Sequence, residues 1–365
     1  MNTTSMQIEE AEELEFKCIS CYPQVYTIIF GLLWGAIISS GIIGNIFIIF
    51  VIVMDKKLMS SSINQFLLNL ALADLGNLVF CTPDVIMILI DRAWILPDAI
   101  CCIVRFLQEY SLYASVLLQM AIGVERFLAI CSPMRMQRFS SRTTVLVLIG
   151  VWCTACCFAS PYLLFQGIRN ARMYKFCTWT IDQPFKEYFK NFEIVVLYAF
   201  PLALLTTLYG IMCRVLWGNG GDQNIANQNQ QLAILKLRRS VVKMLIISML
   251  LYFLCYTPIQ ILHLLKYAAP IWLRLSLNGL SFTSSASNPI VYIICCRHFR
   301  LRLKDLLNTV SNFCLWIFPT VGQTEYESVD EAMTTKLSRS PYVSFRSSRR
   351  QTSRQTSRHN LSTLL

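Results

Sequence analysis

Charged residues are scarce in this sequence. Asp, Glu, Lys and Arg make up 15% of the 365 residues, whereas soluble globular domains contain about 25%. Hydrophobic residues make up 55%, and the mean hydropathy is +0.50. A water-soluble chain would need far more polar surface, so the composition indicates a protein that crosses a membrane several times.

Histidine is rarer still, with His263, His298 and His359 as the whole complement. A catalytic membrane protein needs a nucleophile beside a base, or clustered metal ligands, so we do not expect an enzyme. The net charge is +11, but no basic face recurs along a polar helix, which argues against nucleic-acid binding. Basic residues beside the apolar runs suit the lipid bilayer, where the inner leaflet is anionic.

Cysteine is plentiful, yet its distribution does not indicate a disulfide scaffold. Most of the fifteen cysteines are scattered through apolar runs, including Cys81, Cys153, Cys156, Cys157 and Cys255. Within such runs we expect cysteine to behave as a small core residue.

Seven apolar runs are each long enough to cross a bilayer. They lie at 25–53, 61–90, 99–131, 143–166, 189–217, 240–266 and 272–294. The predicted fold is an all-α membrane protein, a seven-transmembrane helix bundle. We find no internal repeat, and an odd number of spans does not suit a transporter built from two halves, so a transporter is a distant alternative.

The flanking segments complete the domain plan. Lys and Arg are more frequent after spans one, three, five and seven, which predicts an extracellular N-terminus in the plasma membrane. Residues 1–24 are acidic, lack the apolar core of a signal peptide and carry a glycosylation acceptor pattern at Asn2. The seven-transmembrane domain is 25–295. Basic and apolar residues alternate at 296–309, which predicts a short amphipathic surface helix, and 310–365 is a disordered cytoplasmic tail rich in Ser, Thr and Arg.

Polar residues recur at one depth inside the spans. Asp74 lies in the middle of span two, and Asn45, Ser115, Ser284 and Asn288 lie at comparable depth. A charge within lipid needs a partner or a function. Carboxylate, hydroxyl and amide oxygens suit a small cation or trapped water, and a hydrogen-bonded cluster between helices is the alternative.

Short motifs in the spans carry a resemblance. They are Gly44-Asn45 in span one, Asn69 to Asp74 in span two, Glu125-Arg126-Phe127 near the end of span three, Trp152 in span four, Pro201 and Tyr209 in span five, Cys255-Tyr256-Thr257-Pro258 in span six, and Asn288-Pro289-Ile290-Val291-Tyr292 in span seven. Each motif alone is weak, but all seven occur in order on their proper spans. Over about residues 25–305 the chain resembles a rhodopsin-like (class A) G-protein-coupled receptor.

The resemblance implies roles for several residues. Cys101, with Cys102 beside it, would form a disulfide with Cys177 in an oxidising compartment, while Cys18 and Cys21 are either paired or free. Asp74, Ser115, Ser284 and Asn288 match the family's sodium pocket, so an allosteric sodium ion is the one cofactor we expect. Arg126, restrained by Glu125, would engage a heterotrimeric G protein when span six swings outward. The remaining residues matched to activation are Tyr209, Tyr256, Pro258, Asn288, Pro289 and Tyr292.

Two positions depart from the family pattern. Tyr256 stands where the family usually has Trp, which puts a smaller side chain with a hydroxyl at the pocket floor. Arg238 stands where many members place an acid that locks Arg126, and like charges disfavour proximity. We therefore expect a weaker resting lock and measurable ligand-free signalling.

Two residues argue against an amine or retinal as the ligand. Gln108 replaces the acid that amine receptors need, and Phe282 replaces the retinal-binding lysine. By matched position the outer cavity is lined by Asp84, Arg105, Gln108, Glu109, Glu193, Gln260, His263, Arg274 and Asn278. Charges of both signs suit an extended ligand, residues 174–179 alternate as a β-strand does, and the acidic N-terminus would steer a basic peptide. The sequence predicts a neuropeptide-like ligand, with a lipid or small organic ligand as the alternative.

The tail carries short motifs for intracellular partners. Hydroxyl residues follow arginines in two similar segments, 349–353 and 354–358, and phosphates there would add negative charge. This pattern resembles a site for receptor kinases and arrestin. Thr363-Leu364-Leu365 would fit a PDZ groove as an added strand, and Cys314 is a palmitoylation candidate.

Overall fold

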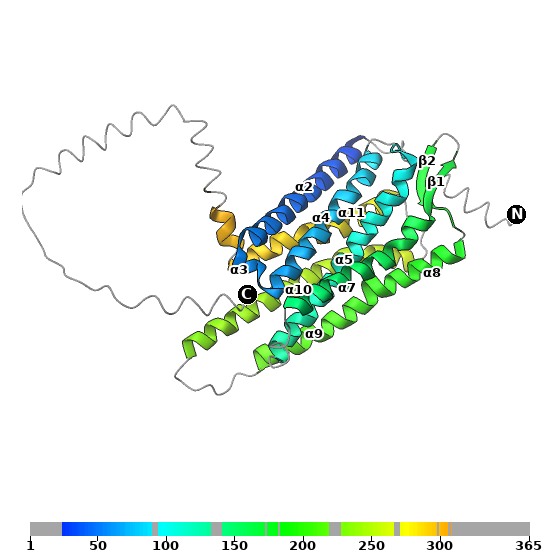
Figure 1. The fold of residues 1–365 in the computed structure, drawn as a ribbon. Coiled ribbons are helices and arrows are strands. Elements are labelled where there is room, and N and C mark those ends of the chain that lie inside the picture. Colours follow the sequence, from blue (N-terminus) through cyan, green and yellow to red (C-terminus); the bar gives the residue numbers. More distant parts are fainter. Residues whose placement is uncertain are drawn as a thin grey trace, which may run out of the picture. The chain divides into compact units, whose positions relative to one another are not determined.

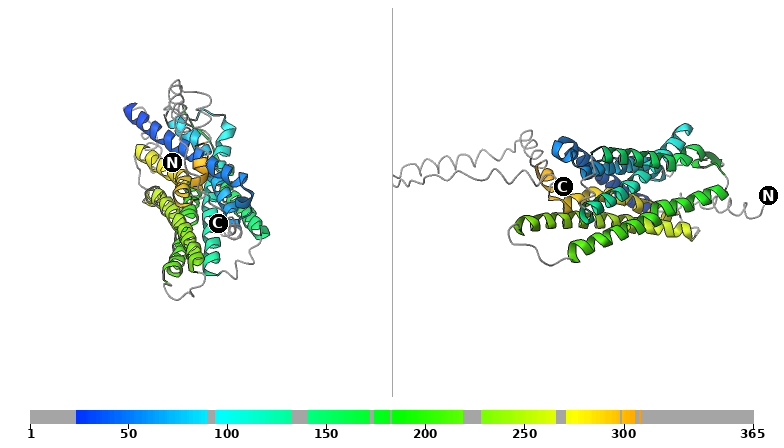
Figure 2. Two further views of the ribbon diagram at one scale, coloured as in Figure 1. Left: turned by 90° about the vertical axis from the view of Figure 1, so that its left-hand side faces the viewer. Right: turned by 60° about the horizontal axis from the view of Figure 1, so that its bottom comes forward.

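The computed structural model describes residues 24–89, 94–132, 141–171, 174–181, 183–218, 228–265, 271–297, 299–305 and 308. Its elements are α2 (Gln24–Met54), α3 (Lys56–Met59), α4 (Ser62–Leu89), α5 (Asp98–Cys131), α7 (Ser141–Phe165), β1 (Gln166–Ala171), β2 (Tyr174–Trp179), α8 (Gln183–Ile194), η2 (Val195–Ala199), α9 (Phe200–Gly218), α10 (Gln228–Leu264) and α11 (Ile271–Cys295). The long helices lie side by side, with the β1–β2 hairpin at one end of the bundle and α3 at the other (Figures 1 and 2). Asn2, Cys18, Cys21, Cys314 and the tail motifs lie outside the described residues.

Within the described residues, six helices are long and apolar enough to cross a membrane. These spans are Thr27–Met54, Ser62–Pro83, Asp98–Cys131, Ser141–Phe165, Pro184–Gly218 and Leu235–Leu264. The seventh, α11, is 25 residues long but carries Ser and Asn residues, several of which are buried in the bundle. The seven-helix bundle predicted from the sequence is confirmed.

Two helices begin earlier than the apolar runs that mark them. The fifth span was expected from 189, but α8 already begins at Gln183 and continues through the π-helical segment η2 into α9. The sixth was expected from 240, but α10 begins at Gln228, and its first turns extend past the neighbouring helices (Figure 1). In both cases hydropathy marks only the membrane-crossing part, whereas polar helix formers such as Gln, Lys and Arg extend the helix into water.

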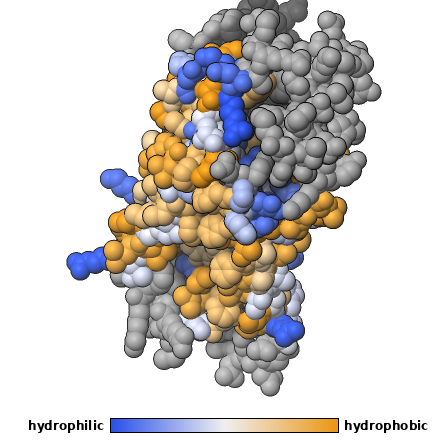
Figure 3. Space-filling view, turned by 90° about the vertical axis from the view of Figure 1, so that its right-hand side faces the viewer, coloured by the Kyte–Doolittle hydropathy of each residue, from blue (hydrophilic) through white to orange (hydrophobic). Residues whose placement is uncertain are grey.

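The outer surface of the bundle is apolar. Leu32, Leu146 and Leu164 are about 70% exposed, as lipid-facing residues should be. Hydrophobic residues cover most of the coloured surface in Figure 3. Cys81 and Cys255 are buried as expected, but the expectation of a core position is wrong for Cys153, Cys156 and Cys157, which are exposed on α7. Because a thiol is a small, weakly polar group, it is tolerated on either face of a membrane helix.

A second unit begins at Arg297. Residues 299–305 are helical; that the segment 296–309 lies on the membrane surface stays a prediction.

Helices α2 and α11 approach closely at small residues. A Cβ atom on Gly41 would lie 2.7 Å from the Cβ of Ala286 and 2.9 Å from its Cα. A Cβ on Gly44 would lie 2.8 Å from Pro289. Small residues at such crossings allow membrane helices to pack through van der Waals contact. Gly41 and Gly44 are therefore required because α11 lies so close, and not because the backbone of α2 needs glycine.

Replacing Gly41 with alanine should therefore destabilise the bundle. The added methyl group would meet the backbone of Ala286, and overpacking of this kind costs about 1–3 kcal/mol. Gly35→Ala is the matched control, because a Cβ at Gly35 on the same helix has nothing within 4 Å. We expect a lower melting temperature in detergent for Gly41→Ala alone. Equal melting temperatures for the two variants would contradict the close packing.

Candidate functional site

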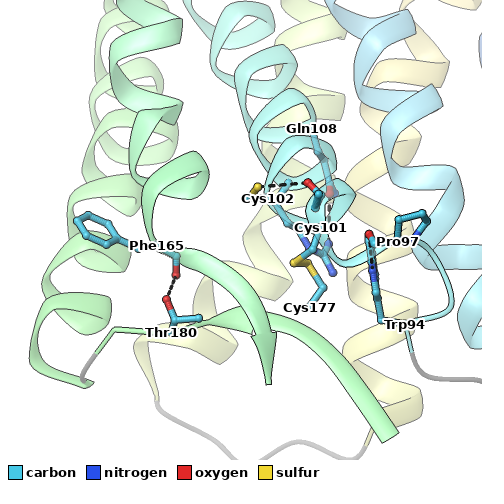
Figure 4. The surroundings of a disulfide bond; sticks show 10 residues. Trp94, Pro97, Cys101, Cys102, Gln108, Phe165, Cys177 and Thr180 are labelled. Carbon is cyan, nitrogen blue, oxygen red and sulfur yellow. Dashed lines mark hydrogen bonds between the residues drawn. A yellow bond between two sulfur atoms is a disulfide. The ribbon is translucent and has the colours of Figure 1, made fainter. Parts of the chain in front are cut away.

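The hairpin is fixed over the beginning of α5. Cys101 and Cys177 form a disulfide with a Cα–Cα distance of 5.6 Å, whereas Cys102 remains a free thiol (Figure 4). The predicted strand at 174–179 is present as β2, paired antiparallel with β1. Lys175 of β2 forms an ion pair with Asp98 at 2.9 Å, and its carbonyl accepts a hydrogen bond from the backbone N–H of Trp94. These contacts join the residues just before α5 to the hairpin.

The expected ligand-contacting residues lie on five helices, α4, α5, α8, α10 and α11. Arg105, Gln108 and Glu109 are half-buried on α5, Gln260 is half-buried and His263 exposed on α10, and Arg274 is half-buried and Asn278 exposed on α11. Arg105 Nη1 donates to Gln108 Oε1 at 3.3 Å. The side chain of Asp84 lies outside the described residues. Acids and bases therefore occur together around this end of the bundle.

Glu193 does not occupy the open position that the sequence suggested. It is 6% exposed, and its Oε1 accepts hydrogen bonds from Tyr113 at 3.0 Å and Tyr162 at 2.6 Å. Its Oε2 pairs with Lys190 Nζ at 2.7 Å. A buried carboxylate has to be paired and hydrogen-bonded, and α5, α7 and α8 each supply a partner here.

Lys190 is the residue that the sequence analysis missed. Hydropathy does not single it out, because the first turns of α8 are polar. An i, i+3 spacing from Glu193 on a continuous helix would have been the available signal.

Hydroxyl groups tie α10 to the π-helical segment η2. Tyr252 donates to the carbonyl of Leu197 at 2.6 Å, and the hydroxyls of Tyr198 and Thr257 are 2.8 Å apart. Thr257 directly precedes Pro258, the proline inside α10. A π-helical turn disturbs the regular pairing of backbone carbonyls, and Tyr252 satisfies one of them. Tyr256 is 5% exposed, with its ring 4.6 Å from that of Tyr252.

Asp74 is the centre of the polar core. Its side chain is fully buried, Oδ1 accepts from Ser115 of α5 at 2.8 Å, and Oδ2 accepts from Asn288 of α11 at 2.7 Å. Ser284 lies at the same level, but its Oγ donates to the carbonyl of Ser281 instead. Of the four residues expected at a sodium ion, three are joined directly.

Further amides extend this core to α2. Asn77 donates to Ser285 Oγ at 3.1 Å, and Asn45 Nδ2 donates to the carbonyls of Gly41 and Ser285. Asn45 Oδ1 is buried without a hydrogen-bond partner among the described residues. A buried acceptor of this kind requires a donor or a cation.

The end of α5 farther from the hairpin carries the acid–base pair. Arg126 forms two contacts with Glu125, between Nε and Oε2 and, at 2.7 Å, between Nη2 and Oε1. Glu125 is 1% exposed. Tyr209 and Tyr292 are buried, and a Cβ on Gly123 would lie 3.6 Å from the hydroxyl of Tyr209, so Tyr209 lies against α5 close to this pair.

Helix α10 offers Arg126 no acidic partner, because residues 228–264 contain no Asp or Glu. One of its basic residues, Arg239, contacts α9. Arg239 donates twice to the carbonyl of Leu216, at 3.1 and 2.7 Å, near the C-terminus of α9. It also lies over the ring of Trp217, 5.3 Å from the centroid. The inner end of α10 is thus attached to α9.

Comparison with known proteins agrees with this arrangement. A family model described as 7 transmembrane receptor (rhodopsin family) matches residues 44–292. Neuropeptide receptor 15 of Caenorhabditis elegans is 33% identical over 73% of this chain and 86% of its own. Galanin receptor 2a of Danio rerio is 27% identical over 80% and 81%, and the human neuromedin-K receptor is 28% identical over 75% and 60%. The chain belongs to the rhodopsin family of seven-transmembrane receptors.

Proposed function

We propose that the protein is a cell-surface receptor that binds a neuropeptide-like ligand at the hairpin end of the bundle and activates a heterotrimeric G protein at the Arg126 end. The names of the similar proteins, which include a neuropeptide receptor, galanin receptors and neuromedin-K receptors, support a peptide ligand. The mixed charges on the outer parts of α5, α8, α10 and α11 suit a ligand with several polar contacts.

One observation carries the proposal. The same helix, α5, bears Arg105, Gln108 and Glu109 near its start and the Glu125–Arg126 pair near its end. Its 34 residues span about 51 Å at 1.5 Å per residue, more than the thickness of a bilayer. A ligand and an intracellular partner can therefore bias the same element from opposite sides of the membrane.

The disulfide at the hairpin end supports one orientation of the receptor in the membrane. The Cys101–Cys177 disulfide needs an oxidising compartment, which supports an extracellular hairpin. Helix α2 begins at the hairpin end (Figure 1), so we propose an extracellular N-terminus and a cytoplasmic tail. The tail motifs keep their proposed partners, which are receptor kinases, arrestin and a PDZ protein.

The test is a screen of synthetic secreted peptides on cells that express the receptor and report several G-protein pathways. At least one peptide should stimulate nucleotide exchange in membranes that contain the receptor and not in empty membranes. Arg126→Ala should abolish the exchange while surface expression persists. Uptake of a solute into vesicles without nucleotide exchange would instead indicate a carrier, and activation by lipids alone would overturn the peptide assignment.

We further propose that the resting state is weakly held and that the receptor signals without ligand. Support comes from the absence of acids in α10 and from Arg238, a like charge at the position matched to the family's lock. Arg238→Glu should create an ion pair with Arg126 and lower basal nucleotide exchange by about fivefold. This factor corresponds to the lower end of typical coupling free energies. Lys236→Glu, two residues earlier on the same helix, is the control. Basal exchange at the level of empty membranes in the unmodified receptor would refute this proposal.

We also propose that a sodium ion binds at Asp74. The site residues fit, since Asp74 contributes a carboxylate, Ser115 and Ser284 contribute hydroxyl oxygens, and the buried Asn45 Oδ1 has no donor among the described residues. Hard oxygen ligands of this kind suit a small cation. An ion held between α4, α5 and α11 would stabilise the arrangement in which these helices now pack.

Sodium should therefore reduce activation. Replacing sodium by N-methylglucamine at constant ionic strength should raise peptide potency about fivefold in the unmodified receptor, because the arrangement that the ion stabilises loses its advantage. Asp74→Asn should remove this dependence on sodium. An equal response to sodium in both proteins would show that the ion acts elsewhere.

A further inference from the structure

The ammonium group of Lys190 is held at the outer end of the bundle by a preformed set of contacts. Nζ lies 2.7 Å from Glu193 Oε2 and donates to the Tyr162 hydroxyl at 2.7 Å. It also lies 5.2 Å from the centroid of the Tyr162 ring. A lysine ammonium has three N–H donors, and these two acceptors engage two of them. The side chain of Lys190 is 35% exposed, against 7% for Glu193.

Glu193 acts as the support for this lysine. Its two oxygens already receive Tyr113, Tyr162 and Lys190, so it is poorly placed to bind anything further. Tyr162 is in turn fixed by the rings of Trp179 at 5.0 Å and Phe189 at 5.7 Å. Because these neighbours hold the side chain in one place, a group that binds Lys190 loses little of its affinity to ordering the lysine.

The charges around Lys190 favour an anion. Lys190 interacts electrostatically with Glu109 of α5 and with His263 of α10, and His263 also interacts with Arg274 of α11. Arg105 interacts electrostatically with Glu109, and Lys186 interacts with His263. Among the described side chains of this group, four permanent cations therefore stand against two carboxylates, Glu109 and Glu193, both of which interact with Lys190.

We propose that Lys190 binds a carboxylate of the peptide ligand, either its C-terminus or an acidic side chain, and that Glu193 and Tyr162 are positioning residues for it. The inference rests on the proposed function as a peptide receptor and adds the chemistry of one ligand group. A charge-assisted hydrogen bond from a partly desolvated ammonium is stronger than a neutral one. A carboxylate in the ligand would also supply the negative charge that the described side chains lack.

The probe is a synthetic peptide library in which each member is made as the C-terminal acid and the C-terminal amide, with further copies in which Asn and Gln replace Asp and Glu. For the peptide that activates the receptor, removing one carboxylate should raise the half-maximal concentration by about tenfold. Lys190→Gln should give a similar loss with the intact peptide, and the two changes should not add, because they remove the same contact. Lys190→Arg keeps the charge and should lose less.

Two further variants guard the interpretation. Lys186→Gln, one turn earlier on α8, controls for a general loss of positive charge and should leave the preference for the carboxylate intact. Lys190→Gln combined with Glu193→Gln does not leave Glu193 as a buried carboxylate without its lysine, and it replaces the single variant if that variant is not expressed; it should also lose the preference. Activation that is indifferent to every carboxylate, or losses that add, would overturn the role of Lys190 while leaving the peptide receptor in place. No activation by any peptide would overturn both.

Discussion

A carboxylate buried in a membrane protein has to find all its partners within the protein, because lipid offers none. Asp74 finds them on α5 and α11, and neighbouring amides extend the same polar core to α2 through Asn45 and Ser285. This constraint fixes the relative positions of four helices at mid-depth. The tight contacts of Gly41 and Gly44 with α11 occur on the same side of the bundle, so packing and polar pairing reinforce one arrangement.

The two ends of the bundle are held by different kinds of contact. The hairpin end is held by the Cys101–Cys177 disulfide and by the hydrogen bonds of the buried Glu193 carboxylate. The inner part is held by the Glu125–Arg126 pair within one helix and by Arg239 at the end of α9. Between them, α10 contacts η2 through two hydrogen bonds beside Pro258. A helix joined by a few hydrogen bonds next to a proline is suited to adopting a second position.

The sequence was sufficient where the pattern is local. Apolar runs predicted the seven helices, the alternation at 174–179 predicted β2, and comparable depth in the spans indicated that Asp74, Ser115 and Asn288 lie together, as their hydrogen bonds show. It was insufficient where partners are remote. The burial of Glu193 depends on Tyr113 and Tyr162, 80 and 31 residues away in the chain, and hydropathy could not detect the polar first turns of α8 and α10. Matched position alone could not distinguish a residue that supports the site from one that faces the ligand.

We infer that the hairpin end and the Arg126 end are coupled through the polar core around Asp74. The direct measurement is peptide affinity in nanodiscs, with and without nucleotide-free G protein. Linkage requires the G protein to raise peptide affinity by the factor that the peptide raises G-protein affinity. We expect the G protein to raise peptide affinity about tenfold in the unmodified receptor and little or not at all in Asp74→Asn. An equal increase in both proteins would contradict it.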